Sequence, residues 1–402
     1  MIVELFDSYG YDSKGGNFIC NAVRKGLKYE PETRVPRKRN ALCTFLMESG
    51  QETNDINQSP LLYKNKIECD EPIPKHDYSK DYFTTEALED GTISFNIWKD
   101  MGTDYITSIS YSKDNGETWT TVNNENNKEA NLQIEVDVEE GDKILWKGGA
   151  QQLGYFDDSE GDNIGSFFSS TCEFNAYGNV MSMLYGDNFS GRKTLSYDCI
   201  FARLFNDYND EQTCFIVNAS NISLPATTLA NSCYSYMFYR CTSLTSAPEL
   251  PATTLAVGCY SSMFNGCISL TTAPELSATI LAGVCYGSMF YGCTSLNAAP
   301  ELPATTLANY CYDHMFYGCT SLTAAPELPA ATLAQGCYNS MFYGCTELNY
   351  IKALFTTTPT NSYTLNWVKD VAANGTFVKS ADATWSVVGD NGVPTGWSVE
   401  NA

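Results

Sequence analysis

Histidine is almost absent from this sequence, with only His76 and His314 in 402 residues. The two lie far apart and in different predicted segments, so a catalytic triad built on histidine or a histidine-rich metal centre has little material. A phosphate-binding glycine loop and a dinucleotide-binding fingerprint are also missing. These absences argue against the commonest enzyme classes, and we expect a protein that is not an enzyme.

Long apolar runs and basic residues are scarce as well. No stretch approaches the roughly 18 apolar residues that a membrane helix needs, and the sequence begins without a basic region followed by an apolar one. Residues 1–80 hold 12 basic and 12 acidic residues, so the formal net charge of −23 lies entirely beyond residue 80. We therefore expect no membrane insertion, and no nucleic acid or anionic membrane surface as partner, because both of these are bound through Lys and Arg.

The first 80 residues are irregular in pattern and contain one basic run, RKGLKYEPETRVPRKR. Its basic residues are Arg24, Lys25, Lys28, Arg34, Arg37, Lys38 and Arg39. Such a run is compatible with a solvated loop or a nucleic-acid patch, but beside an otherwise acidic chain it could equally dock an acidic neighbour. We interpret residues 1–80 as an anchoring and assembly segment.

Internal repetition is the strongest positive signal in the sequence. A 26-residue unit begins at Leu224 and again at Leu250, Leu276, Leu302 and Leu328. The unit is too short and too poor in charge to close its own core, so its Leu, Met, Phe and Cys positions need burial by neighbouring copies. The pattern predicts a solenoid over residues 224–353, with short strands, proline turns and one helical turn around Cys-Tyr-x-x-Met-Phe.

Each unit carries Met-Phe-x-x-Cys-x-x-Leu followed by a turn with proline, as in Met315, Phe316, Cys319, Leu322 and Pro326. This pattern resembles the BspA-type leucine-rich repeats of surface proteins in gut Bacteroidales and of phages that infect them. The period here is a few residues longer than the usual family unit, and alanine and proline stand where isoleucine is common. The resemblance implies a mainly β leucine-rich-repeat solenoid that binds other molecules.

The segments around the repeats differ from them in pattern. Residues 81–150 contain the runs TISFNIW, ITSISYS, TWTTV, LQIEVDV and KILWKG, which predict a small antiparallel β domain of the sandwich type. Residues 151–223 are interpreted as a transition and N-terminal cap, in which CIFARLF and NASNISL look like a degraded copy of the unit. Residues 354–402 lose the repeat and gain Trp367, Trp385 and Trp397, and we interpret them as a C-terminal cap.

Ten of the 16 cysteines fall into two columns of the repeat. The columns are Cys233, Cys259, Cys285, Cys311, Cys337 and Cys241, Cys267, Cys293, Cys319, Cys345. We expect reduced thiols packed as small apolar side chains. Stacked copies would place column neighbours about 4.8 Å apart with parallel side chains, which does not favour disulfides. Some disulfides and metal ligation remain the alternatives.

The segment SKDNGETW is similar to the Asp-box of sialidases and related β-propellers. The matching residues are Ser112, Asp114, Gly116, Thr118 and Trp119. In that motif the Asp caps backbone amides of a hairpin turn and the Trp packs beneath, so the implied role is structural. Sialidases repeat the box and add an arginine cluster, whereas residues 81–223 hold only Arg192 and Arg203. A glycan-active enzyme is therefore a distant alternative.

An acidic loop, FDDSEGDN, offers Asp157, Asp158, Glu160 and Asp162 as ligands for Ca²⁺, a hard cation that carboxylates bind. The spacing matches a calcium loop only in part, because no further acid follows in GDNIGSFF. A solvated acidic loop is our main interpretation and a calcium site its alternative. No other cofactor is expected.

The positions that vary between copies point to function. The dipeptides on either side of Cys-Tyr change freely while the core residues stay fixed, so these positions should face solvent. We expect the ligand-binding residues of the repeats to be Tyr236, Tyr239, Tyr291, Tyr310, Asp313, His314, Tyr317 and Tyr343. A neutral face rich in aromatic rings and hydroxyl groups suits stacking on sugars or docking on a protein. Drift on an idle surface is the alternative.

These features together predict a non-enzymatic binding protein. The leading hypothesis is a phage virion protein of the fibre or decoration type, which residues 1–80 anchor to other virion structural proteins and whose repeats meet a host surface protein or glycan. The alternative is a bacterial cell-surface adhesin, which should carry an export signal that a virion protein does not need. Whether copies of the chain form a homo-oligomer is left open.

Overall fold

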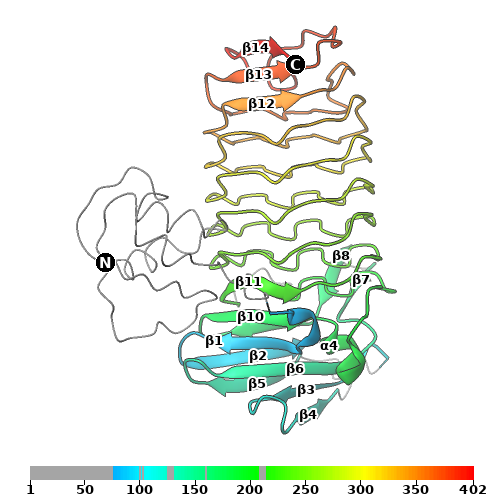
Figure 1. Cartoon of the computed structure of the whole chain (residues 1–402), viewed down its shortest axis with the longest axis vertical. Helices are drawn as coiled ribbons and strands as arrows, with labels where there is room; N and C mark the ends of the chain where they lie inside the picture. The colour runs from blue at the N-terminus through cyan, green and yellow to red at the C-terminus, as the bar shows by residue number, and fades with distance from the viewer. Residues whose placement is uncertain (1–75, 99–100, 102–103, 125–130, 159–160, 208–213) are drawn as a thin grey trace, which may run out of the picture. The chain divides into compact units, whose positions relative to one another are not determined.

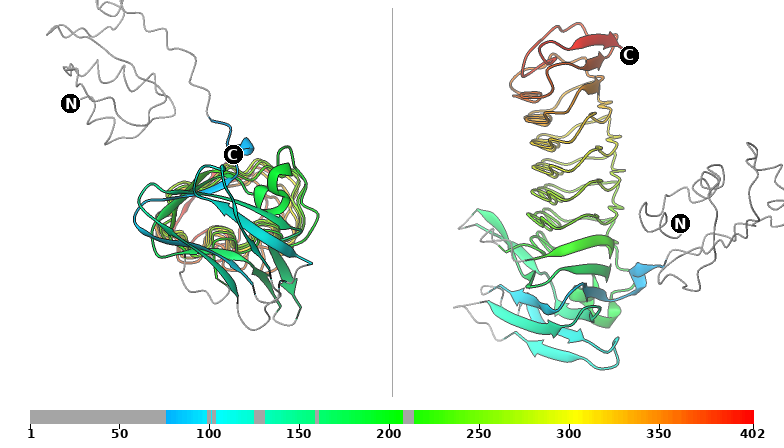
Figure 2. Two further views of the ribbon diagram at one scale, coloured as in Figure 1. Left: turned by 90° about the horizontal axis from the view of Figure 1, so that it is seen from below. Right: turned by 90° about the vertical axis from the view of Figure 1, so that its left-hand side faces the viewer.

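The computed structural model describes residues 76–98, 101, 104–124, 131–158, 161–207 and 214–402. The chain divides into two compact units, Met1–Asp77 and Tyr78–Ala402. The basic residues of the predicted anchoring segment lie outside the described residues. The second unit is mainly β, with several sheets and very little helix (Figures 1 and 2). Within the described ranges, no helix is both long and apolar enough to span a membrane.

The second unit opens with a short 3-10 helix, η2 (Tyr78–Lys80), and six strands. The strands are β1 (Phe83–Ala87), β2 (Gly91–Ile97), β3 (Ile106–Ser112), β4 (Thr120–Asn123), β5 (Leu132–Val138) and β6 (Lys143–Ala150). The pairings of β1 with β6, β2 with β5, and β3 with β4 and β6 are all antiparallel. The five predicted strand runs therefore form strands β2 to β6, whereas β1 was not predicted.

Two sheets face each other across an aromatic core. One sheet has six strands in the order β11-β10-β1-β6-β3-β4, and the other has three in the order β5-β2-β9. Phe83 and Trp146 of the first sheet contact Phe168 of the second, with ring centroids 5.4 and 5.2 Å apart. All three side chains are fully buried, so this core holds the two layers together.

Residues 151–223 contribute to the same sandwich. Their elements are β7 (Gly154–Asp157), β8 (Asp162–Gly165), β9 (Phe167–Ser170), β10 (Phe174–Asn179), α4 (Ser182–Tyr185), η3 (Gly186–Asn188) and β11 (Ile216–Ser223). Strands β9, β10 and β11 join the two sheets, so the sandwich runs beyond residue 150 into the predicted transition. Strand β11 pairs in parallel with β10, and its Asn218 forms a bridge with Ser246 of the first repeat copy. The sheet is thus continuous with the repeats.

Each copy of the repeat in residues 224–353 lies against the next (Figures 1 and 2). In the Cys-Tyr-x-x-Met-Phe segment, every second backbone N–H donates to the following copy, as Tyr234 N does to Cys259 O at 3.0 Å and Phe238 N to Met263 O at 2.9 Å. The N–H groups in between close turns within the segment, such as Met237 N to Tyr234 O at 3.3 Å. These bonds leave few backbone groups of the segment unsatisfied.

The helical turn predicted for this segment is wrong. Every fourth residue has a positive φ, as at Ser232, Tyr236 and Arg240 of the first copy. A left-handed residue at this spacing reverses the curvature of the chain before a helical turn can continue. As a result, Cys-Tyr and Met-Phe point inward as buried pairs. The prediction that the residues between them all face solvent is wrong in part, because Ser235, Ser262 and Ser340 are buried.

Val284 occupies one of the positive-φ positions, with φ 56°, although it is β-branched. Replacing Val284 with glycine should raise the free energy of unfolding by about 1 kcal/mol, because left-handed backbone costs such a residue on the order of 1–3 kcal/mol and costs glycine little. The Val284 side chain is 38% exposed, so its removal loses little buried surface. Denaturant unfolding of the two proteins measures the difference.

Val257→Gly is the matched control for that measurement. Val257 is 51% exposed and is not among the described residues with positive φ. Glycine there should lower stability by about 0.5–1 kcal/mol, because it gains no relief of strain and adds freedom to the unfolded chain. An equal loss of unfolding free energy in Val284→Gly and Val257→Gly would contradict the proposed backbone strain at Val284.

The segments before and after the repeats both pack against the neighbouring repeat copy. Upstream, Phe201 N donates to Cys233 O at 2.9 Å and the Phe201 ring stacks on Tyr234, so the segment interpreted as a degraded copy packs against the first repeat. Downstream, Phe342 N donates to Trp367 O at 2.9 Å, and the strands β12 (Tyr350–Ala353), β13 (Thr376–Lys379) and β14 (Ser398–Asn401) form a parallel sheet. The three predicted cap tryptophans, Trp367, Trp385 and Trp397, are buried, and each indole N–H donates to a backbone carbonyl.

Candidate binding face

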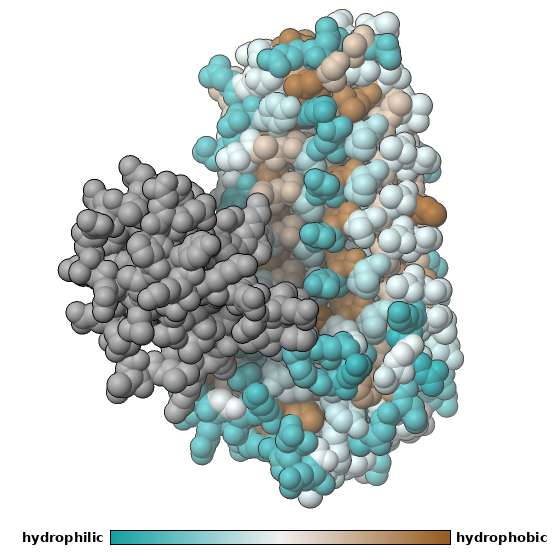
Figure 3. Space-filling view, in the orientation of Figure 1, coloured by the Kyte–Doolittle hydropathy of each residue, from teal (hydrophilic) through white to brown (hydrophobic). Residues whose placement is uncertain are grey.

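Half-exposed residues that flank the buried pairs of the repeat segment form a surface that we call the tyrosine face. It contains all of the predicted ligand-binding residues, which are Tyr236, Tyr239, Tyr291, Tyr310, Asp313, His314, Tyr317 and Tyr343. Each of them is half-buried, so each is anchored in the stack and still reaches solvent. Because neighbouring copies align residue by residue, the surface of the unit repeats its hydrophilic and hydrophobic residues in rows along the stack (Figure 3).

Three tyrosines of the face form a continuous stack. The ring centroids of Tyr291 and Tyr317 are 4.5 Å apart with planes 4° from parallel, and those of Tyr317 and Tyr343 are 4.6 Å apart with planes at 11°. Lys369 Nζ lies 5.2 Å from the centre of the Tyr343 ring and continues the row. Partial burial, followed by the neighbouring Tyr291 and Tyr343, raises the pKa of Tyr317.

The stacking decides what this row can offer to a ligand. Tyr317 has a ring on each of its two faces, so neither face can take a sugar or an aromatic side chain. What Tyr317 presents outward is a ring edge. Ligand stacking along the whole row, as the sequence suggested, is therefore excluded at Tyr317.

A second group of polar residues lies beside the stack. His314 Nδ1 is 2.9 Å from Asp313 Oδ2, and the His314 ring stacks on Tyr317 with centroids 5.7 Å apart. Gln335 Nε2 donates to the Tyr310 hydroxyl at 3.0 Å. A Cβ at Gly336 would come within 2.2 Å of the Tyr310 ring, so the absence of a side chain in the next copy makes room for this tyrosine.

The other end of the face is occupied by cations. The Arg203 guanidinium lies 4.5 Å from the Tyr236 ring and 5.9 Å from the Tyr239 ring, and the Arg240 guanidinium lies 5.2 Å from Tyr239. Tyr236 and Tyr239 also meet edge to face at 5.4 Å. Burial is the largest cause of the raised pKa of Tyr236. These contacts fix both rings through cation–π attraction.

Arg203 is the most deeply engaged cation of this region, and sequence reasoning missed it. Its Nε donates to Asn163 O at 2.7 Å, one terminal nitrogen donates to Asn206 Oδ1 at 2.9 Å, and the other pairs with Asp162 Oδ2 at 2.9 Å. The side chain is only 4% exposed. Arg203 therefore clamps strand β8 to the degraded copy of the repeat.

The acidic loop with the calcium candidates is partly used by this clamp. Asp162 is committed to Arg203, and Glu160 lies outside the described residues. In the part of the chain that the structure describes, no group of three His, Cys, Asp or Glu residues could hold a metal ion. Asp157 and Asp158 lie at the end of β7 and just after it. Calcium binding here stays a prediction.

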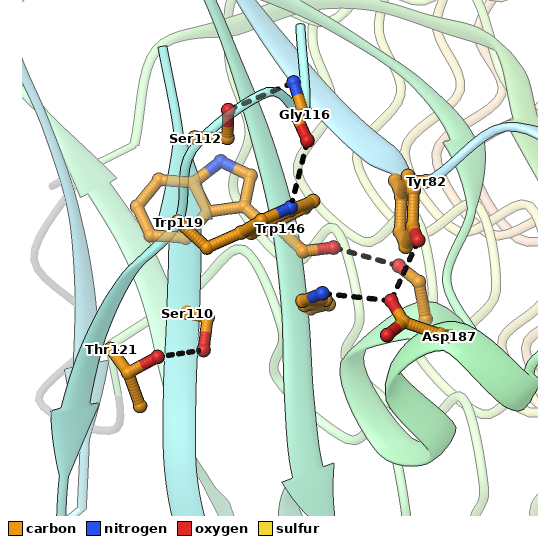
Figure 4. A network of polar contacts seen from close by, with 10 residues as sticks. Tyr82, Ser110, Ser112, Gly116, Trp119, Thr121, Trp146 and Asp187 are labelled. Carbon is orange, nitrogen blue, oxygen red and sulfur yellow. Dashed lines mark hydrogen bonds and ion pairs between the residues drawn. The ribbon is translucent and has the colours of Figure 1, made fainter. Parts of the chain in front are cut away.

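The Asp-box forms the turn between β3 and β4, as predicted (Figure 4). Gly116 N donates to Ser112 Oγ at 2.9 Å, and the Trp119 indole donates to Gly116 O at 3.2 Å. The Trp119 ring also lies 4.0 Å from Lys147 Nζ, and Lys147 pairs with Asp187 at 2.8 Å. The motif is thus tied into the sandwich, which confirms its structural interpretation.

Asp114 of this turn should titrate far below an ordinary aspartate. Its carboxylate accepts bonds from the Thr118 hydroxyl and backbone N–H and from Ser112 Oγ, and these lower the pKa of Asp114 to about 2. The ionised form is favoured in the folded state. Its contribution to stability is therefore complete above pH ~4 and is lost as the pH falls from ~4 to ~2.

Carboxyl NMR resonances recorded against pH measure this titration directly. Asp114→Asn is the control, because its amide keeps an acceptor oxygen but has no titration in this range. The variant should therefore lose the low-pH signal and part of the stability near neutral pH. A midpoint for Asp114 near the model-peptide value of about 3.9 would contradict the capping geometry.

The repeat cysteines are free, buried thiols in the structure. In the second column each thiol lies within 3.0–3.4 Å of a backbone carbonyl of the preceding coil, as Cys267 Sγ does for Phe238 O and Cys293 Sγ for Phe264 O. Burial raises the pKa of Cys293 to about 12. The columns are packing elements, as the main sequence interpretation proposed.

Alkylation in the native state should therefore spare both columns. Iodoacetamide reacts with thiolates, and buried thiols with raised pKa values supply almost none. Peptide mass spectrometry should find the column cysteines unmodified in native protein and modified after unfolding in guanidinium. Peptides that stay unmodified after unfolding unless a reductant is added would instead indicate disulfides.

The tyrosine face therefore combines a closed aromatic stack, an Asp-His pair and flanking cations on rigid backbone. Such a surface can form hydrogen bonds through phenol, amide and imidazole groups and can attract anionic groups at its two ends. No family model, curated protein or solved structure matches this chain.

Proposed function

We propose that this chain is a non-enzymatic binding protein whose tyrosine face contacts the surface of a host cell. The observation that carries the proposal is the half-exposed stack of Tyr291, Tyr317 and Tyr343. Ordered aromatic side chains with polar tips are typical of recognition surfaces, because they bury a large area at a low cost in conformational entropy. Their carbonyl oxygens accept hydrogen bonds from the preceding copy and their N–H groups donate within their own copy, as Tyr317 O does from Gly292 N at 2.7 Å and Tyr317 N to His314 O at 3.2 Å. Little ordering is therefore needed on binding.

The fold that we propose for residues 224–353 is a leucine-rich-repeat solenoid of the BspA type with 26-residue units. Its supports are the strict period of the sequence, the backbone hydrogen bonds between successive copies and the burial of the Leu, Cys, Met and Phe columns. In such an architecture, the equivalent residues of successive copies line up, so one exposed position of the unit becomes a row of side chains on the surface. A row of side chains can contact an extended ligand at several points, for example a glycan chain or an extended segment of a protein.

For the location of the protein, we propose the surface of a phage virion. Residues 1–80, with their basic run, would anchor the chain to acidic virion proteins, and the repeats would point to the host. A bacterial cell-surface adhesin is the second candidate, because the same repeat family occurs there. A glycan-active enzyme is the most distant candidate.

Mass spectrometry of purified particles and of outer-membrane fractions from a producing culture separates the two locations. Peptides of the chain enriched in particles would support the virion protein, and enrichment in membranes would support the adhesin. Binding is tested with the labelled full chain on intact host cells. Tyr317→Ser with Tyr343→Ser should reduce cell binding at least tenfold, and unchanged binding would overturn the role of the face.

A further inference from the structure

Asparagine is followed directly by glycine at four places in the chain, and all four lie within the described residues. The dipeptides are Asn115-Gly116, Asn265-Gly266, Asn374-Gly375 and Asn391-Gly392. In such a dipeptide the backbone nitrogen of the glycine can attack the side-chain carbonyl carbon of the asparagine, because glycine has no Cβ to block the approach. Whether the attack occurs in the folded protein depends on what the glycine N–H is bonded to.

Three of the four glycine N–H groups are held in hydrogen bonds. Gly116 N donates to Ser112 Oγ at 2.9 Å, Gly266 N to Tyr291 O at 2.7 Å and Gly392 N to Gly389 O at 2.9 Å. Each of these bonds has to break before the nitrogen can attack, and breaking it costs free energy. Asn391 is restrained further, since its side-chain amide donates to Asn361 Oδ1 at 2.6 Å.

The dipeptide Asn374-Gly375 lacks this protection. Asn374 is exposed, and within the described part of the chain neither its side-chain amide nor the Gly375 N–H has a hydrogen-bond partner. The dipeptide lies directly before β13, in the segment that follows the last repeat copy. Of the four glycine nitrogens, that of Gly375 is therefore the one that can attack without first losing a hydrogen bond.

We propose that Asn374 is a site of spontaneous deamidation in the folded protein. The Gly375 nitrogen loses its proton to hydroxide and forms a bond to Asn374 Cγ. The bond between Cγ and Nδ2 then breaks, and the amide nitrogen leaves as ammonia after taking a proton from water, which regenerates the hydroxide. Water next adds to one of the two carbonyl carbons of the cyclic imide and opens the ring to aspartate or isoaspartate. The net reaction consumes one water and releases one ammonia, and it does not depend on the proposed binding function.

Isoaspartate at this position would disturb the C-terminal sheet. It lengthens the main chain by one methylene directly before Gly375, whose carbonyl accepts a hydrogen bond from Ser398 N at 2.9 Å. The space around Gly375 is filled, since a Cβ there would clash with Asn349 O and come within 2.8 Å of Trp397 Cε2. The extra methylene therefore has to displace β13 from its neighbours, and we expect the isoaspartate form to unfold at a lower temperature than the unmodified protein.

The test incubates the full chain in native buffer at mildly alkaline pH and follows its peptides by mass spectrometry over time. We expect Asn374 to deamidate at least tenfold faster than the other three asparagines, because only their glycine nitrogens must first lose a hydrogen bond. In guanidinium, where native hydrogen bonds are lost, the four sites should react at similar rates. Asn374→Gln should remove the reaction at this site and leave the rates at the other three unchanged.

Thermal unfolding of the products, separated by charge, measures the effect on the sheet. Asn374→Asp is the matched control, because it adds the same negative charge without lengthening the main chain. It should unfold near the temperature of the unmodified protein, since Asn374 is exposed. An isoaspartate fraction that unfolds together with Asn374→Asp would reject the displacement of β13.

Two results would overturn the site itself. Equal native rates at all four dipeptides would show that the hydrogen bonds of the glycine N–H groups give no protection. An Asn374 that stays unmodified in the native protein but reacts in guanidinium would show that the folded chain closes this site. Neither result bears on the tyrosine face or on the proposed function.

Discussion

Replacing Phe290 with alanine should lower the free energy of unfolding of this protein by about 3–5 kcal/mol. Phe290 is fully buried, and its ring stacks on Phe264 at 5.7 Å and on Phe316 at 5.6 Å. Truncation removes the ring and leaves a cavity between two copies whose backbones are held in place by hydrogen bonds. Because those bonds limit collapse around the cavity, we expect a cost near the upper end of the range.

Chemical denaturation, followed by tryptophan fluorescence and circular dichroism, measures this loss. Ile268→Ala is the matched control, because Ile268 lies in the neighbouring copy but is 46% exposed. Its truncation should cost less than about 1 kcal/mol. If the two variants lost equal stability, the stacked Phe column would not be part of a packed core.

The second large effect is expected at Arg203. Arg203→Ala should lower the free energy of unfolding by about 3 kcal/mol, because removing one partner leaves the other charge and the acceptors Asn163 O and Asn206 Oδ1 uncompensated. We place the cost at the lower end of the usual range for a buried pair, since Asp162 is 34% exposed and solvent screens part of its charge.

Arg192→Ala is the control for this substitution. Arg192 is exposed and stacks on Tyr185 at 4.5 Å, so its loss should cost less than about 1 kcal/mol. In addition, Arg203→Ala should change the near-UV circular dichroism of the tyrosines, because Arg203 lies over Tyr236. A loss below about 1 kcal/mol in Arg203→Ala would show that the clamp between β8 and the degraded copy is not a stabilising contact.

Local patterns made much of this unit predictable. Five of the strands in the sandwich follow from alternation of apolar and polar residues, which places buried apolar side chains in β2, β3, β5 and β6, whereas β4 is largely exposed. The Asp-box turn followed from its own short-range hydrogen bonds, all of which join residues at most four positions apart. The buried columns followed from the repeat period, since fixed apolar positions had to be covered by neighbouring copies.

The predictions that failed depended on contacts between residues far apart in the sequence. The Cys-Tyr-x-x-Met-Phe segment has helix-like spacing of its apolar pairs, yet hydrogen bonds to the next copy at alternate residues favour turns with positive φ instead. No local pattern contains that information, because the competing partner lies about 25 residues away along the chain. The same holds for Asp162, which sequence reasoning assigned to an acidic loop and the structure pairs with Arg203.

For the tyrosine face too, some properties follow from the sequence and others from the tertiary structure alone. The sequence by itself determined which residues vary, that Tyr recurs at one of those positions, and that the core beneath is apolar, because all of these follow from comparing copies of one short unit. Only the tertiary structure decided that Tyr291, Tyr317 and Tyr343 stack on one another, so that both faces of Tyr317 are covered. The physical reason is that ring stacking depends on the separation and alignment of neighbouring copies, which long-range hydrogen bonds set and which the period alone does not specify.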